Sequence, residues 1–167
     1  MAVKISASLN YAATPHEVFA MLADEIFQIR KCIATGALNH SVSISAKAER
    51  TVIVSSRDLP TTDFPAFVQN LVGAILAITE TQDWGPADAE GARQGVITVD
   101  IAGAPIDLDG TLSLAPNGHG SVQTVQGDLR ARIPLIGGKI EQAAAPAIES
   151  AINVEREIGQ AWLATRE

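Results

Sequence analysis

The residues Arg132-Ile133-Pro134-Leu135-Ile136-Gly137-Gly138 stand where a last strand should end and a last helix should begin. Proline lacks the N–H that a strand ladder requires, and glycine permits the backbone angles of a turn. After this turn, apolar residues recur at helical spacing almost to the C-terminus, which predicts one long helix. Its predicted apolar arc consists of Ile140, Ala144, Ala147, Ile148, Ala151, Val154, Ile158 and Trp162.

This apolar arc is unusual because alanines form its centre. Two interpretations are open: the helix packs closely on a sheet, or the small side chains leave a cavity under it. A cavity would suit an apolar ligand, since ligand pockets are mostly apolar with a few placed polar groups. Pro146 lies inside the predicted helix and predicts a kink. The polar residues that lie mainly outside the arc are Glu141, Gln142, Glu149, Asn153, Arg156 and Gln160.

Upstream of the turn, the pattern is mainly that of strands. Apolar residues alternate with polar ones over residues 3–11, which predicts a strand with one buried face. A capping box from Thr14 to Glu17 predicts a short helix, and a second should cover residues 24–33 with Ile26, Phe27 and Ile29 inward. Further strands are expected at residues 38–46, 51–57, 74–84, 95–102, 106–114 and 121–133.

The order of these elements predicts an α+β fold. The strands follow one another without helices long enough for parallel crossovers, so we expect an antiparallel sheet of about six to seven strands. Only the terminal helix is long enough to cover the apolar face of that sheet. Residues 64–71 should form a short helix or lid. The whole chain, residues 1–167, is expected to form a single domain.

Composition narrows the class of function. The net charge of −7 disfavours nucleic acid and anionic membrane surfaces as partners. Cys32 is the only cysteine, which excludes an intrachain disulfide and suits a reducing cytoplasm. The N-terminal residues alternate like a strand and lack a signal-peptide core, and the longest apolar run, residues 71–78, is too short to span a bilayer. We therefore expect a cytoplasmic protein with no stable membrane insertion.

No motif in the chain signals catalysis, a metal or a cofactor. The Gly137-Gly138-Lys139 string lacks the first glycine and the final Ser or Thr of a phosphate-binding loop. No Gly-x-Ser-x-Gly nucleophile elbow is present. The histidines have no neighbouring ligands at zinc spacing. They are His16, His40 and His119.

Four polar residues share the apolar faces of predicted elements. His40 alternates with apolar strand residues, Glu80 and Gln82 do so in the 74–84 strand, and Glu155 falls inside the helix arc. A carboxylate facing an apolar cavity is costly unless it is paired, so its pKa should rise. Each side chain either lies at the edge of the sheet or helix, or converges with the others to orient a ligand or to perform acid–base chemistry.

Three strings resemble a known group of proteins: Arg57-Asp58-Leu59-Pro60, Thr79-Glu80-Thr81 with Trp84, and the segment from Ile133 to Glu141. With the order of elements, they resemble the START-like (SRPBCC) superfamily, whose helix-grip fold is shared by birch-pollen-allergen-like proteins and polyketide cyclases. The closer resemblance is to a largely actinobacterial family of domains of unknown function. The resemblance implies a sheet wrapped around the C-terminal helix, with a hydrophobic cavity between them. Members of the superfamily include binders, transporters and enzymes, so the fold does not determine the function.

The favoured hypothesis is binding or transport of a small hydrophobic molecule, such as a lipid or polyketide-like compound, by a monomer or weak homodimer. One alternative is a cyclase- or dehydratase-like enzyme that uses Glu80, Glu155 or His40. Another is a protein-interaction module that uses residues 64–71. The predicted ligand-binding residues are His40, Phe67, Leu76, Ile78, Glu80, Trp84, Ala144, Ala147, Ile148, Ala151 and Glu155.

Overall fold

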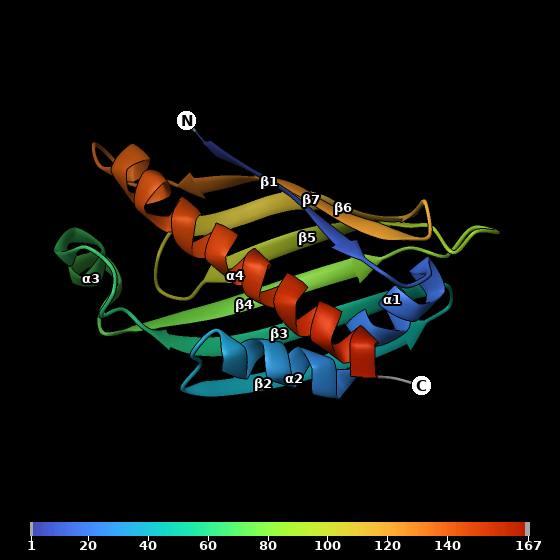
Figure 1. The fold of residues 1–167 in the computed structure, drawn as a ribbon. Coiled ribbons are helices and arrows are strands. Elements are labelled where there is room, and N and C mark those ends of the chain that lie inside the picture. The colour runs from blue at the N-terminus through green and yellow to red at the C-terminus, as the bar shows by residue number, and fades with distance from the viewer. Residues whose placement is uncertain (1, 166–167) are drawn as a thin grey trace.

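The computed structural model describes residues 2–165 and confirms the α+β helix-grip prediction. Seven antiparallel strands form one sheet in the order β1-β7-β6-β5-β4-β3-β2, and the long helix α4 crosses one face of it (Figure 1). The elements are β1 (Val3–Tyr11), α1 (Pro15–Leu22), α2 (Glu25–Ala34), β2 (Asn39–Lys47), β3 (Arg50–Pro60), α3 (Ala66–Val72), β4 (Ile75–Trp84), β5 (Arg93–Ile101), β6 (Ile106–Asn117), β7 (Gly120–Ala131) and α4 (Gly137–Thr165).

The two short helices after β1 begin at side-chain caps. The Thr14 hydroxyl accepts from the Glu17 N–H at 3.2 Å, and the Glu17 carboxylate accepts from the Thr14 N–H at 2.9 Å. These bonds satisfy N–H groups that the first helical turn leaves free.

In α2 the prediction for Ile26 was wrong, since its side chain is 55% exposed. The inward arc of α2 instead runs through Phe27 and Lys31, which are four residues apart and therefore share a face.

The C-terminal half of α4 packs closely against β1 and the helices α1 and α2. Gly159 allows this approach, because a Cβ built there would lie only 2.7 Å from the Tyr11 ring. Farther along, Trp162 meets Phe27 edge-to-face with ring centroids 5.7 Å apart. These contacts fix one end of α4 on the sheet. The helix is continuous through Pro146.

The turn before α4 is held by backbone and side chain together. Gly137 is required because a Cβ there would collide with the carbonyl oxygen of Ala131. The left-handed backbone of this turn falls on Leu135, with φ of 73°, rather than on a glycine. Glu141 was predicted to lie outside the apolar arc, which was wrong. Its carboxylate is buried and accepts a hydrogen bond from the Ala131 N–H at 3.0 Å, which joins the first turn of α4 to the end of β7.

Candidate ligand cavity

A cavity of about 650 Å³ lies between the sheet and the N-terminal half of α4. The sheet contributes mainly apolar side chains from β4 to β7, among them Ile78, Ile97, Val99, Leu108 and Leu129. The helix contributes the small residues Ala143, Ala144, Ala147 and Ala151. In this structure the alanines therefore face open space. Of the two interpretations of the alanine arc, close packing and a cavity, the second describes this part of α4.

The exposed residues of the cavity wall gather at one side. They are Ala34 and Gly36 at the end of α2, Pro60, Asp63 and Pro65 around the loop before α3, and Pro146, Ala147 and Ser150 on α4. The opening therefore lies between the end of α2, the β3–α3 loop and α4. In Figure 1, α3 stands beyond the ends of β3 and β4, apart from the other helices. The 64–71 segment, predicted as a helix or lid, thus forms part of the rim, with Val68 buried.

Most of the predicted ligand-binding residues line this cavity. They are Leu76, Ile78, Glu80, Ala144, Ala147, Ile148, Ala151 and Glu155. Gln82, also predicted to face inward, joins them and is 2% exposed. Strand parity and helix periodicity were sufficient to place these side chains, because both follow directly from backbone geometry.

Three predicted residues do not line the cavity, and their predicted place was wrong. His40 is exposed because β2 is an edge strand, which the helices do not fully cover. Trp84 lies outside the cavity, fully buried and edge-to-face with Phe19 at 5.8 Å between ring centroids. Phe67 is half-buried on α3, with the Lys139 ammonium 5.1 Å from its ring centre. Parity and spacing show which face a residue is on, but not how far along that face the cavity extends.

A polar cluster occupies one flank of the cavity. We define it as Lys31, Arg57, Glu80, Gln82 and Glu155, which come from α2, β3, β4 and α4. The Lys31 ammonium donates to the Glu155 carboxylate at 2.9 Å and to the Glu80 carboxylate at 3.1 Å. The Gln82 amide donates to the same Glu80 oxygen at 2.8 Å. Arg57 Nη2 lies 3.9 Å from the other Glu80 oxygen.

The cluster keeps its central residues charged. Desolvation by itself would raise the pKa of Glu80, but the charges of Lys31 and Arg57 and the bond from Gln82 lower it to about 2. Desolvation would likewise lower the pKa of Lys31, yet the charges of Glu155 and Glu80 outweigh it and raise that pKa. The predicted rise for Glu80 was therefore wrong, because the prediction gave Glu80 no partner. A carboxyl with so low a pKa is a weak general base and cannot serve as a general acid near neutral pH.

Lys31 and Arg57 are the two charged residues of the cavity's polar cluster that the sequence analysis missed. Lys31 follows the buried Phe27 by four residues, which places both on the inner face of α2. Arg57 alternates with the buried Ile53 and Ser55 of β3, and its side chain is 8% exposed. The alternation in β3 therefore indicates that Arg57 faces inward, whereas the spacing in α2 indicates only that Lys31 shares a face with Phe27.

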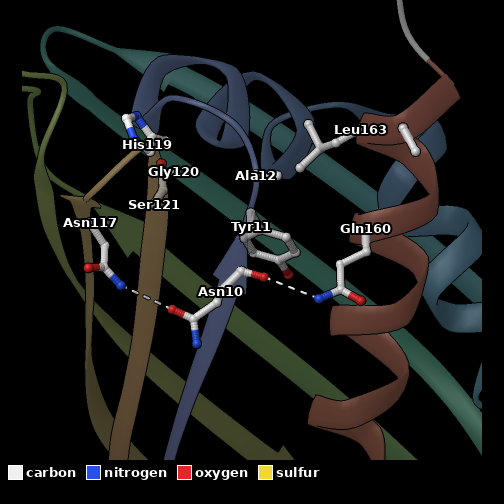
Figure 2. Close-up of a pocket in the computed structure, with 10 residues that line it drawn as sticks. Asn10, Tyr11, Ala12, Asn117, His119, Gly120, Ser121, Gln160 and Leu163 are labelled. Carbon is white, nitrogen blue, oxygen red and sulfur yellow. Dashed lines mark hydrogen bonds between the residues drawn. The ribbon is translucent and has the colours of Figure 1, made fainter.

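A second hollow, of about 520 Å³, lies at the far end of α4 (Figure 2). It is more open than the first, and its polar rim is partly paired. The Asn117 amide donates to the Asn10 side chain at 3.3 Å, and the Gln160 amide donates to the Asn10 carbonyl at 3.2 Å. Both bonds are drawn in Figure 2. These contacts tie β1, β6 and α4 together, so the cavity under the alanines is the better candidate for a ligand.

An antiparallel sheet around a long C-terminal helix, with a mainly apolar cavity between them, is a helix-grip fold. The chain belongs to the DUF2505 family, described as proteins of unknown function, whose model matches residues 6–163. This family accounts for the resemblance carried by the Arg57, Glu80 and Ile133 segments, all of which lie inside the match. Within residues 2–165, no helix combines the length and apolarity that crossing a membrane requires.

Three individual proteins show the similarity of this chain in sequence or in fold. An uncharacterized protein of Mycobacterium tuberculosis is 32% identical over 107 residues, which cover 60% of this chain and 59% of that protein. The Zhui aromatase/cyclase from Streptomyces sp. R1128 has a TM-score of 0.56 at 12% identity, covering 99% of this chain and 97% of its own. A STAR-related lipid transfer protein fragment from Xanthomonas axonopodis has a TM-score of 0.56 at 11% identity, covering 93% and 85%. At these identities the two structures share the fold alone.

Proposed function

We propose that this protein binds a small, mainly apolar molecule in the cavity between the sheet and α4. The observation that carries the proposal is the cavity itself: about 650 Å³, walled by aliphatic side chains, with one polar flank. Ligand pockets are typically about 300–1,000 Å³ and combine apolar walls with a few polar groups that orient the ligand. The space lies under alanines, so the absence of larger side chains on α4 is what leaves it open.

The class of ligand follows from the walls. Apolar surface gains about 25 cal/mol for each Å² removed from water, so an apolar molecule gains most from this cavity. A lipid or a polyketide-like compound has that character. Two structural neighbours, named as a lipid transfer protein and an aromatase/cyclase, favour the same class. The low pKa of Glu80 supports binding over proton transfer as the work of this site.

Filling the cavity tests the proposal. N-phenyl-1-naphthylamine, a neutral dye whose fluorescence rises in apolar surroundings, is titrated into the wild-type protein and the Ala151→Phe variant. The phenyl ring of the variant enters the cavity, and dye affinity should fall by about tenfold or more, equivalent to about 1.4 kcal/mol. Ala161→Phe is the matched control, because Ala161 is exposed on the same helix and does not line the cavity.

Equal dye affinity in the wild-type protein and Ala151→Phe would refute a binding site under α4, and so would no dye binding at all. Native mass spectrometry of protein purified from its own host complements this test. It should show an added mass that organic extraction releases, and that mass identifies the molecule. The Ala151→Phe variant should carry less of the added mass than Ala161→Phe.

A further inference from the structure

We propose that the ligand carries a neutral hydrogen-bond-accepting oxygen, such as a carbonyl, and that the guanidinium of Arg57 binds it. This inference rests on the proposed function and adds a chemical group to it. Arg57 lies on the inward face of β3, where it pairs across the strands with Ile78, and both residues line the cavity. A hydrogen-bond donor that faces an apolar cavity favours ligands that carry an acceptor.

The N–H groups of Arg57 are buried, and some of them lack a hydrogen-bond acceptor among the described residues. Its side chain is 8% exposed, yet neither Nε nor Nη1 has a hydrogen-bond partner among the described residues. Its ion-pair partner, Glu80, lies 3.9 Å from Nη2, which is beyond hydrogen-bond distance. A buried N–H without a partner is costly, and more so on a charged group. No described protein atom accepts a hydrogen bond from Nε or Nη1, so a ligand acceptor or a water molecule must do so.

The charges of the cluster favour a neutral acceptor over a carboxylate. Lys31 and Arg57 supply two positive charges, and Glu80 and Glu155 supply two negative ones, so the cluster is formally balanced. An ionised ligand carboxylate would add an uncompensated negative charge to a buried site, at a cost in desolvation. A carbonyl oxygen accepts from Arg57 without changing this balance. The geometry therefore points to a ketone, ester or similar group rather than an acid.

The position of Arg57 also orients the ligand. Arg57 shares its part of the wall with Leu59 and Gly36, close to the opening, while Leu112 and Val125 line the deeper part. A molecule whose oxygen meets Arg57 therefore directs its hydrocarbon part along β5, β6 and β7. A ligand that fills the same space without an acceptor displaces water from Arg57 and leaves its N–H groups unpaired. Such a ligand should bind more weakly.

Three probes of equal chain length test the inference: dodecane, 2-dodecanone and dodecanoate, each used to displace N-phenyl-1-naphthylamine. In the wild-type protein, 2-dodecanone should bind about tenfold more tightly than dodecane, as expected for one hydrogen bond to a charged group. The Arg57→Met/Glu80→Gln variant removes one charge of each sign, so the cluster stays balanced. In that variant the preference for the ketone should fall to about one, since general changes in the cavity cancel in the ratio.

The matched control is Arg50→Met/Asp83→Asn, which removes an ion pair of 2.8 Å between the same two strands, outside the cavity. Its ketone preference should equal that of the wild-type protein. Equal binding of dodecane and 2-dodecanone to the wild-type protein would overturn the inference while leaving the proposed function standing. Tighter binding of dodecanoate than of 2-dodecanone would overturn the neutral character of the group. If none of the probes displaces the dye, the proposed function itself is contradicted.

Discussion

Lys31→Met should destabilise the protein more than any other single change in the polar cluster. Lys31 has a side-chain exposure of 3% and bonds to both carboxylates of the cluster. Its removal leaves Glu155 without its one hydrogen-bond partner among the described residues, while Glu80 retains Gln82 and the distant Arg57. Breaking a buried ion pair by removing one partner costs about 3–5 kcal/mol. For a chain of this size, that corresponds to a fall in Tm of roughly 6–20 °C.

Urea unfolding followed by circular dichroism measures this loss. Lys4→Met is the matched control, because Lys4 also forms an ion pair, 2.7 Å from Asp128, but its side chain is 83% exposed. Exposed pairs contribute about 0–1 kcal/mol, so this variant should unfold nearly as the wild-type protein does. The double variant Lys31→Met/Glu155→Gln removes the stranded charge and should recover about 1–3 kcal/mol of the loss.

Two results would refute the reasoning. One is a Lys31→Met variant whose free energy of unfolding lies within about 1 kcal/mol of the Lys4→Met value. The other is a double variant no more stable than Lys31→Met alone, since the cost would then not come from the unpaired carboxylate. Loss of packing around the lysine stem would remain in both variants, so the comparison between them isolates the charge.

Two further outcomes are expected from urea unfolding. The folded pKa of Glu80 is lowered to about 2, so its ionised form stabilises the fold fully above the ordinary value of 4.5, and this contribution is lost as pH falls toward 2. The wild-type advantage over Glu80→Gln should therefore shrink by about 3 kcal/mol between about pH 6 and pH 2, and a constant advantage would contradict the pairing. Gly159→Ala should cost about 1–2 kcal/mol, because overpacking against Tyr11 outweighs the gain in helix propensity. Gly138→Ala, which meets nothing within 4 Å, should be neutral or slightly stabilising, and equal stability of the two variants would show that Gly159 is not confined.

Periodicity predicted most of the fold because it reports backbone geometry directly. The alternation over β4 placed Ile78, Glu80 and Gln82 on one face, and the structure brings all three to the cavity. The helical spacing after Gly138 predicted α4 and its alanine arc in the same way. The prediction that Ile26 points inward was wrong because α2 is short and has apolar residues on both sides. In such a helix the burial of Gln28 and Lys31 depends on what packs against it, and the periodicity of α2 alone does not show that.

The ion pairs of the polar cluster could not be predicted from local sequence patterns. Lys31 lies 49 residues from Glu80 and 124 residues from Glu155 along the chain. Periodicity showed that both carboxylates face inward, but not that one lysine meets both. The pKa of Glu80 depends on that missing fact, because the same burial raises the pKa of an unpaired carboxyl and permits a low one beside two cations.

Lys31 also explains why space remains under α4. It bonds to Glu80 on the sheet and to Glu155 on α4, so it fixes the distance between the sheet and α4 on one flank of the cavity. Gly159, one turn beyond Glu155, holds the C-terminal half of α4 against Tyr11. Ala144 precedes both contact points, so it belongs to a stretch of α4 whose distance from the sheet is already fixed by Lys31 and Gly159. The alanines in that stretch do not bring α4 closer to the sheet, and the volume that they leave unfilled is available to a ligand.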